Sequence, residues 1–398
     1  MKRVLVAMSG GVDSSVAAWL LRQEGWDVVG CTMQLWDARR NPSDASVRPS
    51  TGGCCSPDDV FDARRVAERL GVPFFVVNLE ADFERHVVAP FIEGYLLGST
   101  PIPCARCNTF LKFGGLLRFA RGLGIEYVAT GHYARIESAG QDGFRLLRGV
   151  DERKDQSYFL FELRQAQLAR VVFPLGGYRK TDTRRLAREA DLPTAVKRES
   201  REICFLPDGD LAGFIRRETG RVRSDLLPVL ENRDRPGAIE LADGSRLGTH
   251  GGVFRYTVGQ RKGLGVAYRE PLYVTKIDPE RNRLVVGPRS ELLSLGLVTA
   301  ASHWIRRPQV DLQEPMRVEV KIRSTHRPVS AVVVQEGEPE GPTVVLFDEP
   351  QAAITPGQAA VFYRGSEVLG GGWIQRPLSN EEALIRRREA GFSTMRSH

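Results

Sequence analysis

Two groups of residues in this 398-residue chain have types and spacing that suit chemistry. The first is "AMSGGVDSS" at 7–15, where glycines stand beside hydroxyl side chains after an apolar run. Glycines let the backbone approach an anion closely, and a following helix offers free N–H groups and the positive end of its dipole. The stretch predicts a phosphate-binding loop, although an ordinary capped turn is the alternative. It has neither the Lys of a Walker A loop nor the G-x-G-x-x-G dinucleotide spacing.

The second group is formed by Cys104, Cys107 and Cys204. The C-x-x-C spacing of the first two suits a zinc clip, a redox couple, or one catalytic thiol beside an incidental neighbour. A structural zinc needs four ligands, and the adjacent Cys54 and Cys55 have a poor geometry for a second clip. Two alternatives remain: the three cysteines ligate an iron–sulfur cluster, or they are buried structural thiols.

The pattern of the secondary-structure elements that must position these residues changes near residue 205. The first part alternates strand-like runs, such as 3–8 and 27–36, with helical patterns, such as 14–25. Strands separated by helices predict a parallel sheet covered on both faces, with ligands at the carboxyl ends of its strands. From about 206, after one more helix, short β-rich runs with frequent Gly and Pro predict a small barrel or sandwich.

Composition adds weaker constraints. The net charge of +7 permits a polyanionic partner such as nucleic acid without demanding one. Basic stretches such as 178–188 are by themselves typical of solvated helix faces. Six cysteines are too few and too unevenly spread for a disulfide scaffold, and no stretch is typical of a signal peptide or a membrane span. We therefore expect a cytoplasmic, monomeric protein with reduced thiols and no membrane contact.

The loop at 7–15 resembles the S-G-G-x-D-S-S loop of the PP-loop ATP pyrophosphatases. The resemblance implies that it holds the pyrophosphate of ATP, that Mg²⁺ neutralises the phosphates, and that the substrate is activated by adenylation. Amidating synthetases share this loop, so a small-molecule ligase is one alternative, and an RNA-binding protein without catalysis is another. The residues expected to contact ATP are Ala7, Met8, Ser9, Gly10, Gly11, Val12, Asp13, Ser14, Met33 and Gly131.

Longer stretches resemble the bacterial tRNA-specific 2-thiouridylases and occur in the order of that family. They are "MSGGVDSS", "GCCSPDDVFDARRVAERLGVPFFVV", "TPIPCARCNTFLKF", "ATGHYAR", "KDQSYFL", "ESREICFLP", "YTVGQRKGLG" and "GQAAVFY". The resemblance implies ATP-dependent replacement of the C2 oxygen of the wobble uridine of tRNA anticodons by sulfur. It also implies three parts: an α/β PP-loop domain with a Rossmann-like parallel sheet (1–205), a small central domain (206–280) and a C-terminal β-barrel (281–376). A polar tail at 377–398 would follow.

Sulfur for such a reaction is best carried as a persulfide, with a second thiol to resolve it. By its place in the matching stretches, Cys107 corresponds to the nucleophile of the family and Cys204 to its persulfide carrier. A transient disulfide between them is then expected, and their loops must meet over the ATP site. Lys112 or a nearby helix start could lower a thiol pKa. A cysteine desulfurase or a sulfur relay protein would supply the sulfur, and AMP and pyrophosphate would leave.

The same matches predict contacts to the tRNA and its target base. A wobble base lies in a single-stranded loop, so it can be turned out into a pocket. Many relatives carry Asn-Pro-Asp before the nucleophile, whereas Cys104 stands here in place of that Asp. This cysteine could substitute as acid or base, be a spectator, or ligate a cluster. The expected contacts are Ile102, Pro103, Cys104, His132, Lys154, Asp155, Gln156, Arg323, Ser324 and Gln358.

Overall fold

The computed structural model describes residues 1–36, 57–199, 203–206, 209–306, 314–337 and 341–391. The chain forms two compact units. The first consists of 1–88, 103–210 and 366–368, and the second of 89–102, 211–365 and 369–398. Cys54 and Cys55, considered above as zinc ligands, lie outside the described residues.

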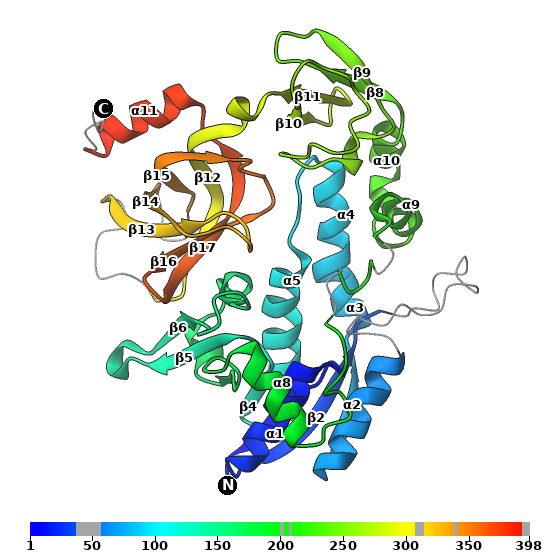
Figure 1. Cartoon of the computed structure of the whole chain (residues 1–398), viewed down its shortest axis with the longest axis vertical. Helices are drawn as coiled ribbons and strands as arrows, with labels where there is room; N and C mark the ends of the chain where they lie inside the picture. The colour runs from blue at the N-terminus through cyan, green and yellow to red at the C-terminus, as the bar shows by residue number, and fades with distance from the viewer. Residues whose placement is uncertain (37–56, 200–202, 207–208, 307–313, 338–340, 392–398) are drawn as a thin grey trace. The chain divides into compact units, whose positions relative to one another are not determined.

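The first unit is built on a five-stranded sheet with the order β3-β2-β1-β4-β7. Figure 1 labels β2 and β4 of this sheet and the helices α1, α2 and α8. Every neighbouring pair of strands is parallel, which confirms the predicted Rossmann-like sheet. The strand order changes direction at β1, and ligands of such sheets bind where the order reverses. The strands are β1 (Arg3–Ala7), β2 (Asp27–Gln34), β3 (Phe74–Asn78), β4 (Tyr127–Thr130) and β7 (Val171–Val172).

Helices cover both faces of this sheet. On one face, buried side chains of α1 (Val12–Gln23), α2 (Pro57–Leu70) and α8 (Lys180–Glu189) form one apolar cluster with Val4 and Val6 of β1. Side chains alternate along a strand, so Leu5 and Val128 face the other side, where α6 (Leu116–Gly122) packs against β4. The unit also contains the hairpin β5 (Ala134–Ser138) and β6 (Phe144–Arg148), the 3-10 helix η6 (Ser157–Leu160) and the short helix α7 (Gln165–Leu168).

Two helical segments contain π-helical turns. The helix α3 (Glu80–Phe83) continues into the π-helix η3 (Glu84–Val88), and α5 (Pro103–Arg106) continues into the π-helix η4 (Cys107–Gly115). The second segment begins at Pro103, because proline is tolerated in the first turn of a helix. Cys107 is the first residue of η4, and π-helical turns often occur at functional positions.

The second unit contains a helical part and a four-stranded sheet with the order β10-β11-β8-β9. Ile239, Val274, Leu284 and Val286 are buried between its strands and the adjoining loops. The strand β11 belongs to this sheet, although the range expected for the C-terminal barrel began at 281. The elements are α4 (Ala89–Leu96), α9 (Leu211–Val222), α10 (Leu227–Arg233), β8 (Gly237–Glu240), β9 (Arg246–His250), β10 (Tyr273–Asp278) and β11 (Arg283–Gly287).

The second unit also contains the predicted β-barrel. Its strands follow the order β12-β15-β14-β13-β16-β17, and β12 also pairs with β17, which closes the barrel. Val320, Val345, Phe347 and Phe362 fill its interior. The strands are β12 (Leu293–Trp304), β13 (Met316–Lys321), β14 (Val329–Gln335), β15 (Thr343–Ala352), β16 (Ala359–Arg364) and β17 (Glu367–Pro377).

The segment expected as a polar tail contains one more helix, α11 (Asn380–Glu389). The Ser379 side chain accepts from the backbone N–H of Glu382 at 3.1 Å, and the Glu382 carboxylate accepts from the Ser379 N–H at 2.8 Å. The residues "SNEE" form a capping box that the sequence contains. The helix was not predicted because the segment has few apolar residues.

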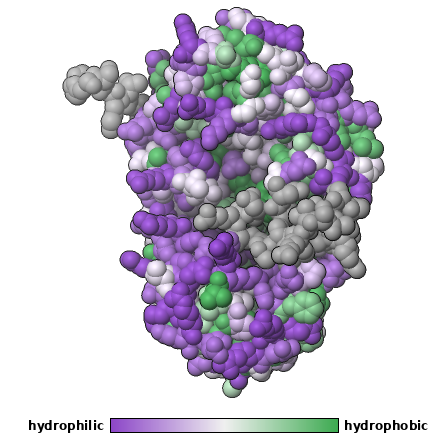
Figure 2. Space-filling model, turned by 45° about the vertical axis from the view of Figure 1, so that its right-hand side comes forward, coloured by the Kyte–Doolittle hydropathy of each residue, from purple (hydrophilic) through white to green (hydrophobic). Residues whose placement is uncertain are grey.

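The surface in view in Figure 2 is mainly hydrophilic, and its hydrophobic residues form separate patches. Large exposed apolar side chains of the described residues, such as Phe61 and Val196, are far apart in the sequence. None of the helices in the described ranges is both long enough and apolar enough to cross a membrane.

Candidate functional site

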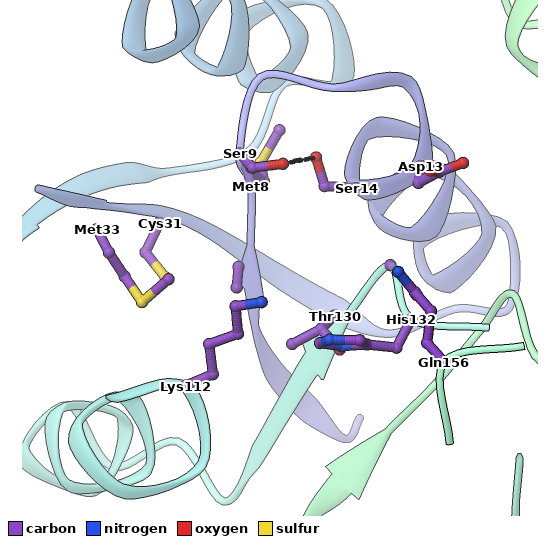
Figure 3. A pocket seen from close by; sticks show the side chains of 12 residues that line it. Met8, Ser9, Asp13, Ser14, Cys31, Met33, Lys112, Thr130, His132 and Gln156 are labelled. Carbon is purple, nitrogen blue, oxygen red and sulfur yellow. Dashed lines mark hydrogen bonds between the residues drawn. The ribbon is translucent and has the colours of Figure 1, made fainter. Parts of the chain in front are cut away.

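A pocket lies at the carboxyl end of the parallel sheet, where the strand order reverses (Figure 3). Its walls come from the ends of β1, β2 and β4, the start of α1, the π-helix η4 and the loop 151–156. This is where a doubly wound sheet binds ligands, because strand ends and helix starts leave backbone groups without ladder partners. The lining residues are Ala7, Met8, Ser9, Asp13, Ser14, Cys31, Met33, Lys112, Thr130, Gly131, His132 and Gln156.

The predicted phosphate loop forms the wall between β1 and α1. The Ser14 hydroxyl accepts from the backbone N–H of Ser9 at 3.1 Å and donates to the carbonyl of Gly11 at 3.1 Å. The Ser15 hydroxyl donates to the same carbonyl at 2.8 Å. These bonds fix the loop ahead of α1, which begins at Val12 and presents its positive end at the pocket. The loop is therefore preorganised for an anion.

Two glycines of the site are required by backbone geometry. Gly10 has a φ of 69°, and a Cβ there would lie 2.2 Å from the carbonyl oxygen of Asp59 in α2. A Cβ on Gly131, just after β4, would lie 2.8 Å from the carbonyl carbon of Asp13. Glycine at both positions lets the phosphate loop sit directly against α2 and the end of β4.

Most residues expected to contact ATP meet at this pocket. Gly10, Gly11 and Val12 shape the loop without lining the cavity. His132 and Gln156, expected to contact the substrate, line the same cavity. The ATP candidates that line it are Ala7, Met8, Ser9, Asp13, Ser14, Met33 and Gly131.

Lys112 is the only cationic side chain among the described lining residues, and Figure 3 shows its amino group directed into the pocket. His132 also lines the pocket, with Nδ1 2.7 Å from the Thr130 hydroxyl. Burial, together with the positive charge of Lys112, holds the pKa of His132 well below 6.5. His132 is therefore a neutral hydrogen-bonding group, and Lys112 supplies the positive charge.

Lys180, at the start of α8, is a site residue that sequence reasoning missed. Its ammonium lies 2.7 Å from each carboxylate oxygen of Asp13. The Tyr133 hydroxyl donates to the same carboxylate at 2.9 Å. In the sequence, Lys180 is part of the basic stretch 178–188, whose pattern is typical of a solvated helix face. In the structure, Lys180 is only 8% exposed. Pairing with a residue so distant in sequence is visible only in the fold.

Glu199 extends this ion pairing away from the pocket. Its carboxylate lies 2.9 Å from the Lys180 ammonium and 2.5 Å from that of Lys154. Arg184 contacts it at 3.4 Å. Burial would raise the pKa of Glu199, but the hydrogen bonds from Lys154 and Lys180 outweigh it and lower the pKa to about 2. Glu199 is therefore ionised at neutral pH.

The loop that carries three expected substrate contacts is held by its own hydrogen bonds. The Asp155 carboxylate accepts from the backbone N–H groups of Gly149 at 3.2 Å and Ser157 at 3.1 Å. The Gln156 side-chain oxygen accepts from the N–H of Tyr133 at 3.0 Å. Asp155 thus shapes the loop, Gln156 reaches the cavity, and Lys154 points to Glu199.

The cysteines differ in environment. Cys104 in α5 is exposed, whereas Cys107 and Cys204 are half-buried and Cys31 is buried. Burial raises the pKa of Cys31 to about 12, so this lining thiol is protonated at neutral pH. Cys107, Cys104 and Cys204 do not line the pocket.

The segments of Cys107 and Cys204 pack against the same helix. The ring of Phe205, next to Cys204, lies 5.5 Å from that of Phe83 at the end of α3. The π-helix η4, which begins at Cys107, also packs against α3. Both thiols are therefore carried on elements that share one neighbour.

The iron–sulfur alternative finds no support in the residues present. Within the described part of the chain, which includes Cys104, Cys107 and Cys204, no three His, Cys, Asp or Glu side chains are grouped so that they could hold a metal ion. The zinc alternative fails on the same ground for these three cysteines, since a structural zinc needs four convergent ligands.

The remaining expected contacts fall in the second unit or beside the cysteines. Arg323 and Gln358 line a second pocket together with Thr100. The Gln358 amide donates to the Thr100 carbonyl at 2.8 Å, and Arg323 donates to the Ala352 carbonyl at 3.3 Å. Ser324 is half-buried next to Arg323 and does not line this pocket. Ile102 and Pro103 are buried.

Family models match three parts of the chain. They are described as tRNA methyl transferase HUP domain (residues 2–208), tRNA methyl transferase PRC-barrel domain (229–288) and aminomethyltransferase beta-barrel domain (294–374). These descriptions agree with the parallel-sheet domain, the central domain and the closed barrel.

Curated relatives align along nearly the whole chain. The tRNA-specific 2-thiouridylase MnmA of Solibacter usitatus is 51% identical over 94% of this chain and 99% of its own length. The proteins of the same name from Geobacter metallireducens and Geotalea uraniireducens are 50% and 48% identical, over 95% and 96% of this chain and 98% and 97% of their own lengths. Identity at this level over almost the full length of both chains shows common descent and a common fold. The chain belongs to the tRNA-specific 2-thiouridylase family.

Proposed function

We propose that this protein is an ATP-dependent tRNA sulfurtransferase that replaces the C2 oxygen of the wobble uridine by sulfur. The observation that carries the proposal is the composition of the pocket at the strand ends. One cavity is lined both by the phosphate loop, through Ser9, Asp13 and Ser14, and by His132 and Gln156, the expected base contacts. A nucleotide phosphate and a pyrimidine can therefore be held side by side.

In the first step, the C2 oxygen of the uridine attacks the α-phosphate of ATP. A bond forms between this oxygen and phosphorus, the bond to the β-phosphate oxygen breaks, and pyrophosphate leaves. The phosphate loop and the start of α1 bind the departing pyrophosphate through N–H groups and hydroxyls. Lys112 stabilises the negative charge at the reacting phosphate. The neutral His132 and the Gln156 amide hold the base through hydrogen bonds.

Mg²⁺ on the phosphates would lower their mutual repulsion. Asp13 is the only carboxylate among the described residues that line the pocket, so it is the residue that would reach such an ion. Its two oxygens are held by Lys180 and Tyr133, and one of them must be released for this contact.

In the second step, the terminal sulfur of a persulfide on Cys204 attacks C2 and displaces AMP. The Cys107 thiolate then attacks Sγ of Cys204, which leaves sulfur on the base and forms a disulfide between the two cysteines. The two cysteines are oxidised by two electrons, and the transferred sulfur is reduced by two. A cellular thiol must reduce this disulfide, and a cysteine desulfurase or a relay protein must reload Cys204.

The packing of both cysteine segments against α3 supports this pairing. Cys104 is exposed, and we therefore assign it no part in acid–base catalysis. The substrates, ATP and tRNA, are consistent with a cytoplasmic location.

The test is a thiolation assay with ATP, Mg²⁺, unmodified tRNA and a persulfide donor. Thiolated tRNA is retarded in a gel that contains a mercury compound, and we expect retardation only when all components are present. The Cys204→Ser variant is the negative control. Absence of thiolated tRNA with the wild type, under conditions in which Cys204 is loaded with persulfide, would refute the proposal.

Two other reactions deserve a control in the same assay. An amidating ligase of this fold would release pyrophosphate with ammonia and a small acid in place of tRNA. The family-model descriptions mention methyl transfer, but a phosphate loop that binds pyrophosphate has no role in that reaction. Pyrophosphate release that requires tRNA separates thiolation from both.

A further inference from the structure

Four charged side chains form a continuous ion-pair chain in the first unit, in the order Lys154, Glu199, Lys180, Asp13. The Lys154 ammonium lies 2.5 Å from Glu199 Oε2, and Glu199 Oε1 lies 2.9 Å from the Lys180 ammonium. The Lys180 ammonium lies 2.7 Å from both oxygens of Asp13. This ion-pair chain runs from the loop 151–156 to the phosphate loop.

The two inner members are shared between neighbours. Lys180 is buried and divides its ammonium between two carboxylates, whereas Glu199 divides its carboxylate between two ammonium groups and the more distant guanidinium of Arg184. In a partly buried site, weakening one ion pair strengthens the next, because a charge that loses one partner turns to the other. Loss of an ion pair at one end therefore changes the strength of the ion pair at the other end.

The geometry around the ion-pair chain is fixed. The Asp151 carboxylate accepts from the backbone N–H of Lys180 at 2.9 Å and from that of Arg153 at 3.1 Å, which ties the start of α8 to the loop of Lys154. Tyr133 holds Asp13 from the other side. The charged groups can therefore exchange partners without movement of the backbone.

The ends of the ion-pair chain reach the two substrates of the proposed function. Asp13 lines the nucleotide pocket. Lys154 retains 38% of its side-chain exposure and belongs to the stretch expected to contact tRNA. The inference rests on the proposed function for the assignment of these two ends.

We propose that the ion-pair chain couples nucleotide binding to tRNA binding, with Lys180 and Glu199 as positioning residues. A metal–nucleotide complex that takes an oxygen of Asp13 releases the Lys180 ammonium, which then turns to Glu199. The stronger ion pair between Glu199 and Lys180 weakens the ion pair between Glu199 and Lys154. The Lys154 ammonium then becomes available to an RNA phosphate. By linkage, RNA binding favours the nucleotide complex to the same extent.

The experiment measures tRNA affinity by fluorescence anisotropy, with and without saturating Mg²⁺ and an ATP analogue whose α,β-bridge cannot be cleaved. In the wild type, we expect the analogue to tighten tRNA binding about tenfold. In Glu199→Gln, Lys154 is released even without the analogue, so tRNA alone should bind about tenfold more tightly than it does to the wild type, and the further tightening by the analogue should fall below about twofold. Arg185→Gln is the matched control, since Arg185 lies in α8 and pairs with Glu189 outside the ion-pair chain.

A second variant, Lys154→Gln, removes one end of the ion-pair chain at an exposed position, so it tests the inference if Glu199→Gln does not fold. In the presence of the analogue, this variant should bind tRNA more weakly than the wild type, and the effect of the analogue should be abolished. Full coupling in either variant, or independent binding of the two ligands to the wild type, would overturn the inference. Failure of the wild type to bind tRNA and the analogue at all would instead refute the proposed function.

Discussion

Two pockets formed by the described residues differ in the groups that line them. The pocket of the first unit contains an acid, a cation and a neutral histidine at the ends of parallel strands, in Asp13, Lys112 and His132. Among the described residues, the pocket of the second unit is lined by hydroxyl, amide and apolar groups and by a single charged residue, Arg323. The first set can stabilise charge that develops during a reaction, whereas the second is suited to binding.

Sheet topology explains this difference. A parallel sheet brings the ends of several strands to one edge, where loops and helix starts converge from distant parts of the sequence. The barrel pairs β12 with β17 and so uses its backbone groups within its own ladder, which leaves side chains of the connecting loops for contacts. We therefore propose that catalysis belongs to the first unit and that the second unit contributes recognition.

The largest expected effect concerns the cysteines of the first unit. Cys204→Ser should lower thiolation by more than about a thousandfold, because the persulfide carrier is lost. Cys107→Ser should block sulfur release to a similar extent and leave the tRNA-dependent release of pyrophosphate intact. Cys104→Ser, at an exposed position, should stay within about twofold of wild type, as in exposed sites without catalytic contacts. Thiolation on mercury gels and pyrophosphate release measure these effects, and a severe loss in Cys104→Ser would break the assignment.

The next effect concerns the acid of the first pocket. Asp13→Asn should lower pyrophosphate release about a hundredfold, because one charge at the phosphate loop and its pair with Lys180 are lost. Loading of Cys204 with persulfide should be unchanged. The control is Asp27→Asn, whose carboxylate pairs with Arg3 at the surface. Equal losses in both variants would mean that Asp13 acts through stability alone.

A smaller effect is expected in the second unit. Arg323→Gln should raise the Kd for tRNA about tenfold and reduce its salt dependence by about one phosphate contact. Its kcat at saturating tRNA should match the wild type. Arg317→Gln, in which an exposed barrel arginine paired with Asp348 is changed, is the matched control. A fall in kcat with unchanged tRNA affinity would contradict the division between chemistry and recognition.

The smallest effect is a pH dependence of stability from His132. Its pKa in the folded state lies below 6.5, mainly because of burial, so the unfolded chain binds the proton more readily. The contribution of this histidine to stability is therefore complete above pH 6.5 and declines by about 1 kcal/mol per pH unit below it. Chemical denaturation at pH 5.5 and 7.5 should show a larger loss of stability in the wild type than in His132→Gln, in which other histidines with lowered pKa values, such as His250 and His326, still contribute. Gln358→Leu, in the second pocket, should shift stability equally at both pH values.

Much of the first pocket could be predicted from sequence because its central motif is local. The glycines and hydroxyls between β1 and α1 stand next to one another in the chain, so their spacing reveals the loop. Gly131 and His132 also follow a strand-like run directly, which places them at a strand end. The barrel was predictable from its short β-rich runs, but its first strand was not. The expected range began at 281 and included β11, which pairs with β8 and β10 instead. The residues of a strand do not show which other strand it pairs with.

The ion-pair chain was not predictable, since its members come from four separate segments. Lys180 stands in a basic stretch whose pattern is that of a solvated helix face, and only the fold buries it against Asp13. The π-helical turn that begins at Cys107 has no sequence signal either, because it depends on how the segment packs against α3.

The sequence by itself determined the phosphate loop, the parallel sheet and the barrel, because each is encoded by neighbouring residues or by a short repeat of apolar positions. The tertiary structure alone decided that His132, Gln156 and Lys112 share one cavity with the loop, and that Asp13 is neutralised by Lys180. The physical reason is that electrostatic pairing depends on distance in space, and folding brings together charges that the chain keeps far apart.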